Sequence, residues 1–417
     1  MLSGSIWADS SAREADGVTR NGGGAKKPSP LNRFGKAMTR RITYLQYTNP
    51  AAYPPLEHSS RILADRGWDV LFLGSGAWGK AEAFRFPPHP RIRTVLSGFP
   101  PPGWRQKLHY AAYCLKSVWQ VWRSRSVWIY ASDPLSCPAA LLASWLPGRR
   151  VIYHEHDSPD TVANSKFMRA VLGAREQLCS RAAAVILPNE ERARIFAGMV
   201  KLGRPPLIVW NCPERREVVA QPSSTAEETV VFYHGSLNAM RLPFSVMEAL
   251  TLAPGKPQLH FAGYITIGQP DFLHDFLAEA ARRGLAGRVK YLGACPERGE
   301  LLAHCSQATI GLAFMPKRSS DINMVAMTGA SNKPFDYMAC GLGLIVSDLP
   351  EWQAMFVKPG HAVACDSEDS GSIARAIAWF VEHPRDAAEM RARGRQKIMA
   401  EWNYEAQFEP VLELLEA

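Results

Sequence analysis

The chain has 417 residues, of which 47% are hydrophobic and 21% charged, and it carries eight cysteines and a net charge of +9. That length is too great for one ordinary core and predicts two or three domains of a globular protein. No apolar run of about 18 residues occurs, so we expect no transmembrane helix. The scattered cysteines form no CxxC pair, which argues against disulfides and zinc and favours free thiols in the cytoplasm.

The first part of the chain holds much of the positive charge. Residues 1–41 contain eight Lys and Arg against three acids, and they include the stretch NGGGAKKPSP. Such a composition, without apolar periodicity, is typical of disorder. We therefore predict a disordered basic segment at 1–40.

From residue 41 onward, short β-type runs alternate with segments of helical periodicity. The predicted strands are 41–46, 69–74 and the runs SVWIYAS, RRVIYHEHD and AAAVILPN, with helices at 56–66, 137–146 and 166–182. This alternation is typical of a parallel sheet covered by helices on both faces. It predicts one α/β domain over residues 41–210.

The alternation starts again after residues 211–226, a Pro-rich stretch that we interpret as a linker. The predicted strands are TVVFYHGS, QLHFAGY, RVKYLGA, ATIGLAF and LGLIVSD, with helices near 244–252, 271–283, 297–304, 334–340 and 370–382. They predict a second α/β domain over 227–395. A C-terminal helix is expected over 396–417, and its return to the first domain is one option. The predicted fold is a pair of Rossmann-like parallel-sheet domains that face each other across a cleft.

Ligands of parallel sheets bind beyond the carboxyl ends of the strands, so the loops there are the places to search. In the second domain, Gly235 follows a predicted strand and Arg241 begins the next predicted helix. A glycine allows a phosphate to approach the backbone amides, and a guanidinium group suits phosphate oxygens. The alternative is that Gly235 only forms the turn and that Arg241 is a solvated surface charge.

Lys333, in the run SNKPFDYMACGLG, is hard to explain by packing alone. Pro334 favours a helix start and Gly341 a helix end, so the lysine lies where the helix dipole disfavours a cation. A long loop without periodicity, residues 315–331, leads to it, and such loops are usually functional. We therefore expect Lys333 and Arg241 to bind a diphosphate together.

Asp336, one turn into the same predicted helix, has two interpretations. As an acid in the first turn, it complements the positive end of the helix dipole. Alternatively, its oxygens accept hydrogen bonds from the hydroxyls of a ribose. The local sequence leaves both interpretations open.

The first domain has a histidine pair at the end of a predicted strand, in YHEHD. His154 and His156 share a face if the strand continues, so a metal site with Asp157 is one interpretation, although no further ligand is specified. A hydrogen-bonding or proton-handling histidine at the cleft is the second interpretation. A structural histidine is the third.

Residues 83–132 contain eight basic residues and no acid. Within them, residues 104–125 read as a helix with tryptophans and leucines on one side and basic residues on the other. The pattern fits a core-facing helix with a solvated basic face, or a helix that lies on an anionic membrane with its tryptophans at the headgroup level. Nucleic acid is the weakest choice, because no known binding module accompanies the charge, and we expect none to bind.

The run SNKPFDYMACGLGLIVSDLPEW resembles a motif of glycosyltransferase family 4 and its relatives with the GT-B fold. The family pattern NK-x-F/L-E-Y-M-A-x-G-x-P-V-I-x-S is met at Asn332, Lys333, Phe335, Asp336, Tyr337, Met338, Ala339, Gly341, Ile345, Val346 and Ser347. HGSLNAMR is similar to the family's glycine-arginine-leucine segment, with Gly235 at the glycine and Arg241 where a lysine is usual. His156 matches a histidine that members place beside the donor sugar. The resemblance extends in weaker form over residues 41–417.

Three positions depart from the family pattern. Many members have two glutamates eight positions apart, where this chain has Thr328 and Asp336. Ser236 replaces an arginine, so one of the two usual phosphate cations is missing, and we expect Lys333 to compensate. Gly343 replaces a common proline, and we expect no chemical cost from this change.

The resemblance implies transfer of a sugar from a nucleoside-diphosphate sugar, with retention of configuration and without a metal or other cofactor. The implied catalytic residues are His156, Arg241 and Lys333. The implied donor-binding residues are Gly235, Ser236, Thr328, Ser331, Asn332 and Asp336. The acceptor, held by the first domain, would be lipid-linked, a polysaccharide or a small molecule.

Two alternatives to a transferase remain at this stage. A sugar-nucleotide epimerase has a similar fold, although the missing glutamate at Thr328 gives it no support. A non-catalytic scaffold of a polysaccharide assembly complex is favoured by Thr328 and Ser236. The leading hypothesis is a cytoplasmic glycosyltransferase, which would rest on the inner face of a membrane if residues 104–125 bind lipid.

Overall fold

The computed structural model describes residues 40–77, 82–101, 103–159, 165–219, 228–265 and 268–417. The segment 1–40 predicted to be disordered lies outside these residues apart from Arg40, and so do residues 220–226 of the predicted linker. No helix in the described parts of the chain is long and apolar enough to cross a membrane.

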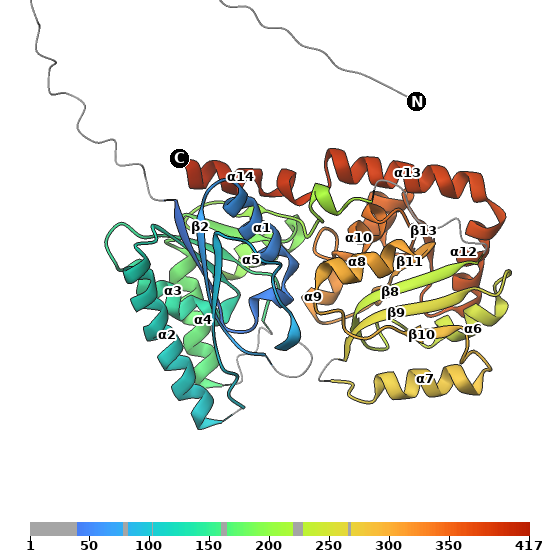
Figure 1. The fold of residues 1–417 in the computed structure, drawn as a ribbon, viewed down its shortest axis with the longest axis horizontal. Helices are drawn as coiled ribbons and strands as arrows, with labels where there is room; N and C mark the ends of the chain where they lie inside the picture. Colours follow the sequence, from blue (N-terminus) through green and yellow to red (C-terminus); the bar gives the residue numbers. More distant parts are fainter. Residues whose placement is uncertain (1–39, 78–81, 102, 160–164, 220–227, 266–267) are drawn as a thin grey trace, which may run out of the picture. The chain divides into compact units, whose positions relative to one another are not determined.

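The first domain, which carries α1 to α5 in Figure 1, contains a seven-stranded parallel sheet. The strand order is β3-β2-β1-β4-β5-β6-β7. Its strands are β1 (Arg41–Gln46), β2 (Asp69–Ser75), β3 (Ile92–Ser97), β4 (Trp128–Ser132), β5 (Arg150–His154), β6 (Ala184–Leu187) and β7 (Leu207–Ile208). Its helices are α1 (Pro54–Asp65), α2 (Trp104–Ser124), α3 (Cys137–Ser144), α4 (Lys166–Cys179) and α5 (Glu190–Met199). Every pair of neighbouring strands is parallel.

The second domain is a six-stranded parallel sheet in the order β10-β9-β8-β11-β12-β13. Its strands are β8 (Val230–Leu237), β9 (Gln258–Ile265), β10 (Val289–Tyr291), β11 (Ile310–Ala313), β12 (Gly343–Ser347) and β13 (Val363–Cys365). The helices of the second half are α6 (Ser245–Leu252), α7 (Phe272–Arg282), α8 (Arg298–Ser306), α9 (Ile322–Val325), α10 (Lys333–Ala339), α11 (Pro350–Trp352), α12 (Ser370–Glu382), α13 (Pro384–Ala400) and α14 (Tyr404–Glu416). The predicted fold of two parallel α/β domains is confirmed.

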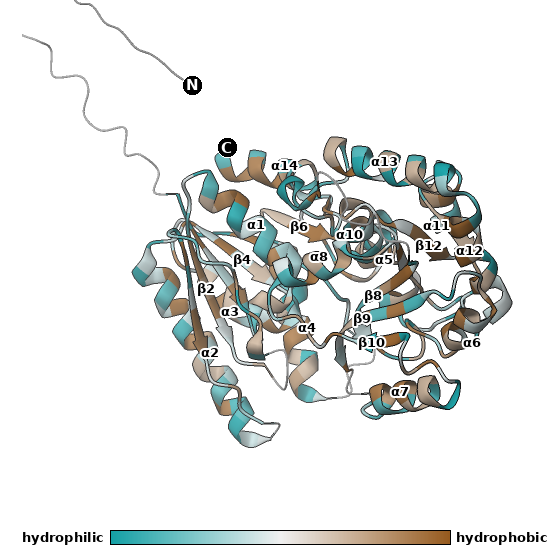
Figure 2. Ribbon diagram, turned by 45° about the vertical axis from the view of Figure 1, so that its right-hand side comes forward, coloured by the Kyte–Doolittle hydropathy of each residue, from teal (hydrophilic) through white to brown (hydrophobic). Residues whose placement is uncertain are grey.

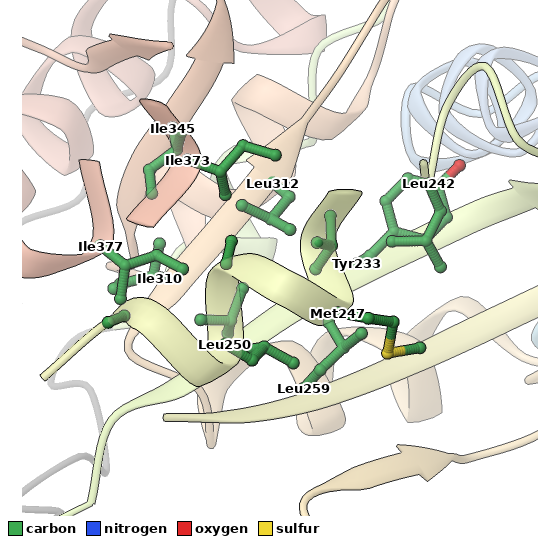
Figure 3. Close-up of a cluster of buried hydrophobic side chains, with 14 of the residues drawn as sticks. Tyr233, Leu242, Met247, Leu250, Leu259, Ile310, Leu312, Ile345, Ile373 and Ile377 are labelled. Atoms are coloured by element: carbon green, nitrogen blue, oxygen red, sulfur yellow. The ribbon is translucent and has the colours of Figure 1, made fainter. Parts of the chain in front are cut away.

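Central strands are hydrophobic along their whole length because both faces of each sheet are covered by helices. All residues of β4 and β12 are buried. β12 is brown in Figure 2. In the second domain, α6 and α12 pack on one face of the sheet, and Figure 3 shows their side chains against Ile310, Leu312 and Ile345.

The strands that the sequence pattern missed are short or lie at an edge, and the helix α5 was not predicted either. β3 is an edge strand whose residues are all at least partly exposed, and β7 and β13 have two and three residues. Such strands lack the continuous apolar run of a buried one. The predicted loop 315–331 contains α9, and α6 begins at Ser245, so Arg241 lies in the turn before this helix rather than at its start.

The end of the chain returns to the first domain. α13 packs beside α10 in the second domain, and α14 packs beside α1 in the first, as Figure 1 shows. The crossing lies between Ala400 and Tyr404, and the buried side chains of α14, including Phe408 and Leu412, join the core under β1 and β4.

The strand orders locate the sites where ligands are expected. Each sheet grows in one direction from its first strand and then in the other, so the order reverses between β1 and β4 and between β8 and β11. Helices leave on opposite faces at such a point and open a crevice beyond the carboxyl ends of the strands.

Candidate active site

A cavity of about 460 Å³ lies between the carboxyl ends of the two sheets and is lined by both domains. Seven of the nine predicted site residues line it: His156, Gly235, Ser236, Arg241, Ser331, Asn332 and Lys333. The structure thus brings together residues that lie up to 177 positions apart, from 156 to 333, in the chain. Thr328 and Asp336 are outside this lining.

Lys333 is the first residue of α10 and is only 4% exposed. Its ammonium group lies 5.7 Å from the centre of the Tyr233 ring, and no carboxylate of the described residues forms an ion pair with it. Burial, together with the nearby charge of Arg241, lowers the pKa of Lys333 to about 7. A buried ammonium group at the positive end of a helix is unfavourable by itself, and a bound anion would stabilise it.

Gly235 makes room for this lysine. It lies within β8 rather than after it, with φ +112°, and an added Cβ would lie 3.0 Å from both Cε and Nζ of Lys333. The sequence predicted that a ligand approaches Gly235 closely. In the structure, the side chain of Lys333 does so. Any side chain at this position would push Lys333 away from the cavity wall.

Arg241 reaches the cavity from the turn after β8. Its guanidinium group donates to Met324 Sδ at 3.1 Å, and none of the described carboxylates pairs with it. Three cationic side chains, Arg192, Arg241 and Lys333, line the cavity against a single carboxylate, that of Asp157. The cavity is therefore suited to an anion.

His156 lies on the first-domain wall, 6% exposed, with its ring 3.9 Å from that of His154 and 5.5 Å from that of Tyr53. Neither ring nitrogen has a hydrogen-bond partner among the residues that the structure describes. Burial and the charge of Arg192 lower the pKa of His156 to about 3, so the ring is neutral at physiological pH. Since buried polar atoms are nearly always paired, His156 has the features of a hydrogen-bonding ligand contact.

Other lining residues carry polar atoms that also lack a partner. They are Oγ of Ser331 and Oδ1 of Asn211, while Nδ2 of Asn211 donates to the Ala330 carbonyl at 2.6 Å. With His156, these residues line the cavity from both domains. A polar ligand with several hydroxyl groups would satisfy them.

Asp336 is fully buried beneath the cavity and engaged with its own partners. Oδ1 accepts from Arg298 at 2.6 Å, and Oδ2 accepts from Asn332 at 3.1 Å. Arg298 also binds Glu217, which lies 3.3 Å from His58 of α1. Both Asp336 oxygens thus bond to groups of the second domain, and Asp336 is not among the cavity-lining residues. Its ribose contact stays a prediction.

Thr328 belongs to a loop that the first domain holds in place. Its carbonyl accepts from Nδ2 of Asn189 at 2.7 Å, and its Oγ1 has no partner. Arg192, 2% exposed, donates to the carbonyls of Ala326, Asn323 and His156 at 3.0, 3.2 and 2.7 Å. Thr328 therefore contacts the first domain through its backbone, and it is not among the cavity-lining residues. Its donor-binding role stays a prediction.

A second cavity, of about 300 Å³, lies where the first sheet reverses between β1 and β4. It shares Thr48, Tyr53 and Asp157 with the main cavity. Asp133 stands at its base with φ 60°, an unfavourable conformation for a residue other than glycine. Its carboxylate accepts from the backbone of His156 at 2.9 Å, and burial raises its pKa to about 7.

Several site residues were not found from the sequence. Asp133 directly follows a predicted strand, and the search of strand ends could have included it. Arg192 and Asn189 begin α5, where Asn189 also caps the helix, and no local signal separates their interdomain contacts from ordinary capping.

Among the described residues, His154, His156 and Asp157 do not form a group of three closely spaced ligand atoms. Nδ1 of His154 is hydrogen-bonded to the hydroxyl of Tyr130 at 2.7 Å. Within the described ranges, the one group of three side chains with ligand atoms within 4.8 Å of one another is Cys295, Glu300 and His304. Only Cys295 of these lines the main cavity, and burial raises the pKa of its thiol to about 11, which disfavours the thiolate that a metal requires.

Two parallel-sheet domains with a basic cavity between their carboxyl edges define a protein of the GT-B fold. Residues 56–211 match the family model described as "Glycosyl transferase 4-like domain", and residues 258–413 match that described as "Glycosyl transferase-like". Together the two models cover more than half of the chain, which therefore belongs to the glycosyltransferases. Among curated protein sequences, none is significantly similar to it.

Solved structures share the same fold. HepE of Anabaena in complex with UDP superposes with a TM-score of 0.66 at 16% identity, over 90% of this chain and 99% of HepE. Sucrose-phosphate synthase of Thermosynechococcus elongatus gives 0.62 at 17% identity, over 90% and 98%. A glycosyltransferase of Rickettsia africae gives 0.64 at 9% identity, also over 90% and 98%.

Proposed function

We propose that this glycosyltransferase takes its sugar from a nucleoside-diphosphate sugar bound in the main cavity. The observation that carries the proposal is a pair of cations, Arg241 in the turn after β8 and Lys333 at the start of α10. Neither has a carboxylate partner in the described chain. HepE, which has the same fold, was solved with UDP-glucose, and this supports a donor of that kind. The neutral, unpaired ring of His156 would contact the donor sugar from the opposite wall.

In the proposed reaction, the bond between the anomeric carbon and the β-phosphate oxygen breaks, and the acceptor oxygen forms a bond to the same carbon. Negative charge develops on the departing diphosphate, where Lys333, Arg241 and the first amides of α10 would stabilise it. The acceptor proton passes to a β-phosphate oxygen. Retention of configuration is proposed from the resemblance to family 4.

No metal or other cofactor is required in this proposal, because the cations at the diphosphate are side chains. The excess of cationic over acidic side chains in the cavity lining supports it, since a divalent ion prefers carboxylate ligands. Addition of a chelator should leave turnover unchanged.

The second cavity is the proposed acceptor site. It opens beside the donor cavity, its walls include Tyr47, Tyr53 and Met168, and Asp133 and Asp157 supply acceptors for hydroxyl groups. Aromatic walls with carboxylates suit a sugar or another polyol. We propose a glycan, a lipid-linked glycan or a small hydroxyl compound as acceptor, and the cytoplasm as the place of the reaction.

Calorimetry and turnover with UDP-, GDP- and ADP-sugars test the donor proposal. Lys333→Met and Arg241→Gln should each lower donor affinity by about 1.5–3 kcal/mol, the range for hydrogen bonds to charged groups. Arg282→Gln, on the exposed face of α7, is the matched control and should bind as the parent does. If the parent and the three variants bind the donor with equal affinity, Lys333 and Arg241 do not bind its diphosphate.

The same assay separates the alternatives. Slow hydrolysis of a bound donor supports a transferase, and conversion to an isomeric sugar nucleotide supports an epimerase. If no sugar nucleotide binds, the result supports the third alternative, a non-catalytic scaffold.

A further inference from the structure

The helix α2 turns an apolar stripe away from the protein. Its large hydrophobic side chains Trp104, Leu108, Leu115, Trp119 and Trp122 are 67%, 62%, 69%, 49% and 61% exposed. At 100° per residue these positions fall within one narrow sector of the helix, so they form a single stripe over five turns. The core-facing orientation considered for these tryptophans is therefore wrong.

The opposite side of α2 already supplies the packing that the helix needs. Tyr110, Tyr113, Cys114 and Val121 are buried against the first sheet and α3. The outward stripe thus contributes nothing to the core, although exposed tryptophan and leucine are unfavourable in water. Figure 2 shows hydrophobic and hydrophilic residues side by side along this helix.

Cations flank the stripe. Arg105, Lys116 and Arg123 lie along one border and Lys107 and Arg125 along the other, and none of them forms an ion pair with a described residue. Arg105 and Arg123 lie over the rings of Trp104 and Trp119, at 5.5 and 5.4 Å from the ring centres. Arg125 even holds the left-handed conformation, φ 56°, that favours glycine.

The edge of the sheet at the last turn of α2 is basic as well. There Arg150 pairs with Trp128 at the start of β4 and β5, and its guanidinium group lies 4.2 Å from the Trp128 ring centre. A cavity of about 370 Å³ at this edge is lined by Trp145, Arg149, Arg150, Arg181 and Arg204, with no acid among its lining residues. Nε of Arg149 is buried without a partner.

We propose that α2 docks this protein on an anionic phospholipid bilayer, with the tryptophans at the headgroup level and the arginines and lysines on lipid phosphates. The cations along α2 favour an anionic bilayer over a second copy of the chain, because two such helices would place their unpaired cations against each other.

The docking surface adjoins the proposed acceptor site, and this part of the inference rests on the proposed function. The hydroxyl of Tyr47, in the second cavity, is hydrogen-bonded to His109 at 2.9 Å, and that of Tyr110 donates to the Leu135 carbonyl at 2.8 Å. Both Tyr47 and Leu135 line the second cavity. An acceptor carried by a membrane lipid would therefore meet the cavity next to the bound helix.

Co-sedimentation with vesicles of phosphatidylcholine, with and without phosphatidylglycerol, tests the docking. The full chain should bind only the vesicles with phosphatidylglycerol and should dissociate as salt is added. Leu115→Ser should weaken binding at least about tenfold, as expected for loss of one buried leucine side chain. Leu252→Ser, 57% exposed on α6 of the second domain, is the matched control and should bind normally.

A further variant separates charge from folding. Arg125→Gly removes a cation while relieving its left-handed conformation, so vesicle binding should fall while the melting temperature stays equal or rises.

Equal binding to both kinds of vesicle, or equal loss in Leu115→Ser and Leu252→Ser, would overturn the inference. So would sedimentation velocity showing a dimer that Leu115→Ser dissociates, without vesicle binding. Donor calorimetry on the same proteins keeps the two proposals separate, because donor affinity should not change.

Discussion

Burial, together with the nearby charge of Arg241, lowers the pKa of Lys333 to about 7. A diphosphate placed beside the ammonium group favours the charged form and raises this pKa. At about pH 8 the free enzyme holds mostly neutral Lys333, so donor binding should take up about one proton. At about pH 6 the lysine is already charged, and the uptake should approach zero.

Calorimetry in buffers of different ionisation enthalpy measures this uptake. In Lys333→Met the pH dependence should disappear, since the sugar diphosphate itself has no group that titrates near neutrality. Uptake at pH 8 that persists in the variant would assign the proton to another group.

Gly343 shows that a residue can be constrained by an element far along the chain. The resemblance to family 4 expects a proline here and suggests no cost for the glycine, yet a Cβ at this position would lie 2.3 Å from the ring of Phe380. The strand β12 and the helix α12 approach closely because the glycine has no side chain.

Gly343→Ala should therefore destabilise the protein by about 1–3 kcal/mol, the usual cost of overpacking a core. Denaturant unfolding of the second domain measures the loss. Phe380→Leu in the same chain should recover part of it, and additive losses in the double variant would contradict the predicted clash.

Arg192 connects the two domains, which pack as one unit over residues 40–417. Its guanidinium group belongs to α5 and holds three carbonyls, two of them in the loop 323–326 of the second domain. Because these carbonyls would lose a charged donor, and only that of Ala326 would keep a further donor among the described residues, in Asn189, Arg192→Met should free the segment before Lys333 and lower kcat/KM.

Hydrogen exchange measures this directly, with faster exchange expected across residues 322–331 and unchanged exchange in β4 and β12. Arg194→Met is the control, because Arg194 lies exposed on the same helix and binds only Glu191. Slow exchange retained in Arg192→Met would show that the loop is held by its other contacts.

The sequence alone determined the alternation of strands and helices, because strands buried on both faces read as apolar runs. It also predicted Lys333, Arg241, Gly235 and His156 as ligand contacts near strand ends and helix starts, and the structure places all four in the lining of one cavity. Edge strands such as β3 and short strands such as β13 lack that pattern and were missed.

Only the tertiary structure decided which face of each element is covered. Helical spacing places the tryptophans of α2 on one side, but contacts with the first sheet and α3 leave that side outward. In the same way, Arg298, 38 positions from Asp336 in the chain, forms a buried ion pair with the carboxylate for which the sequence left a ribose contact open. Such outcomes depend on contacts between distant residues, which a local pattern does not contain.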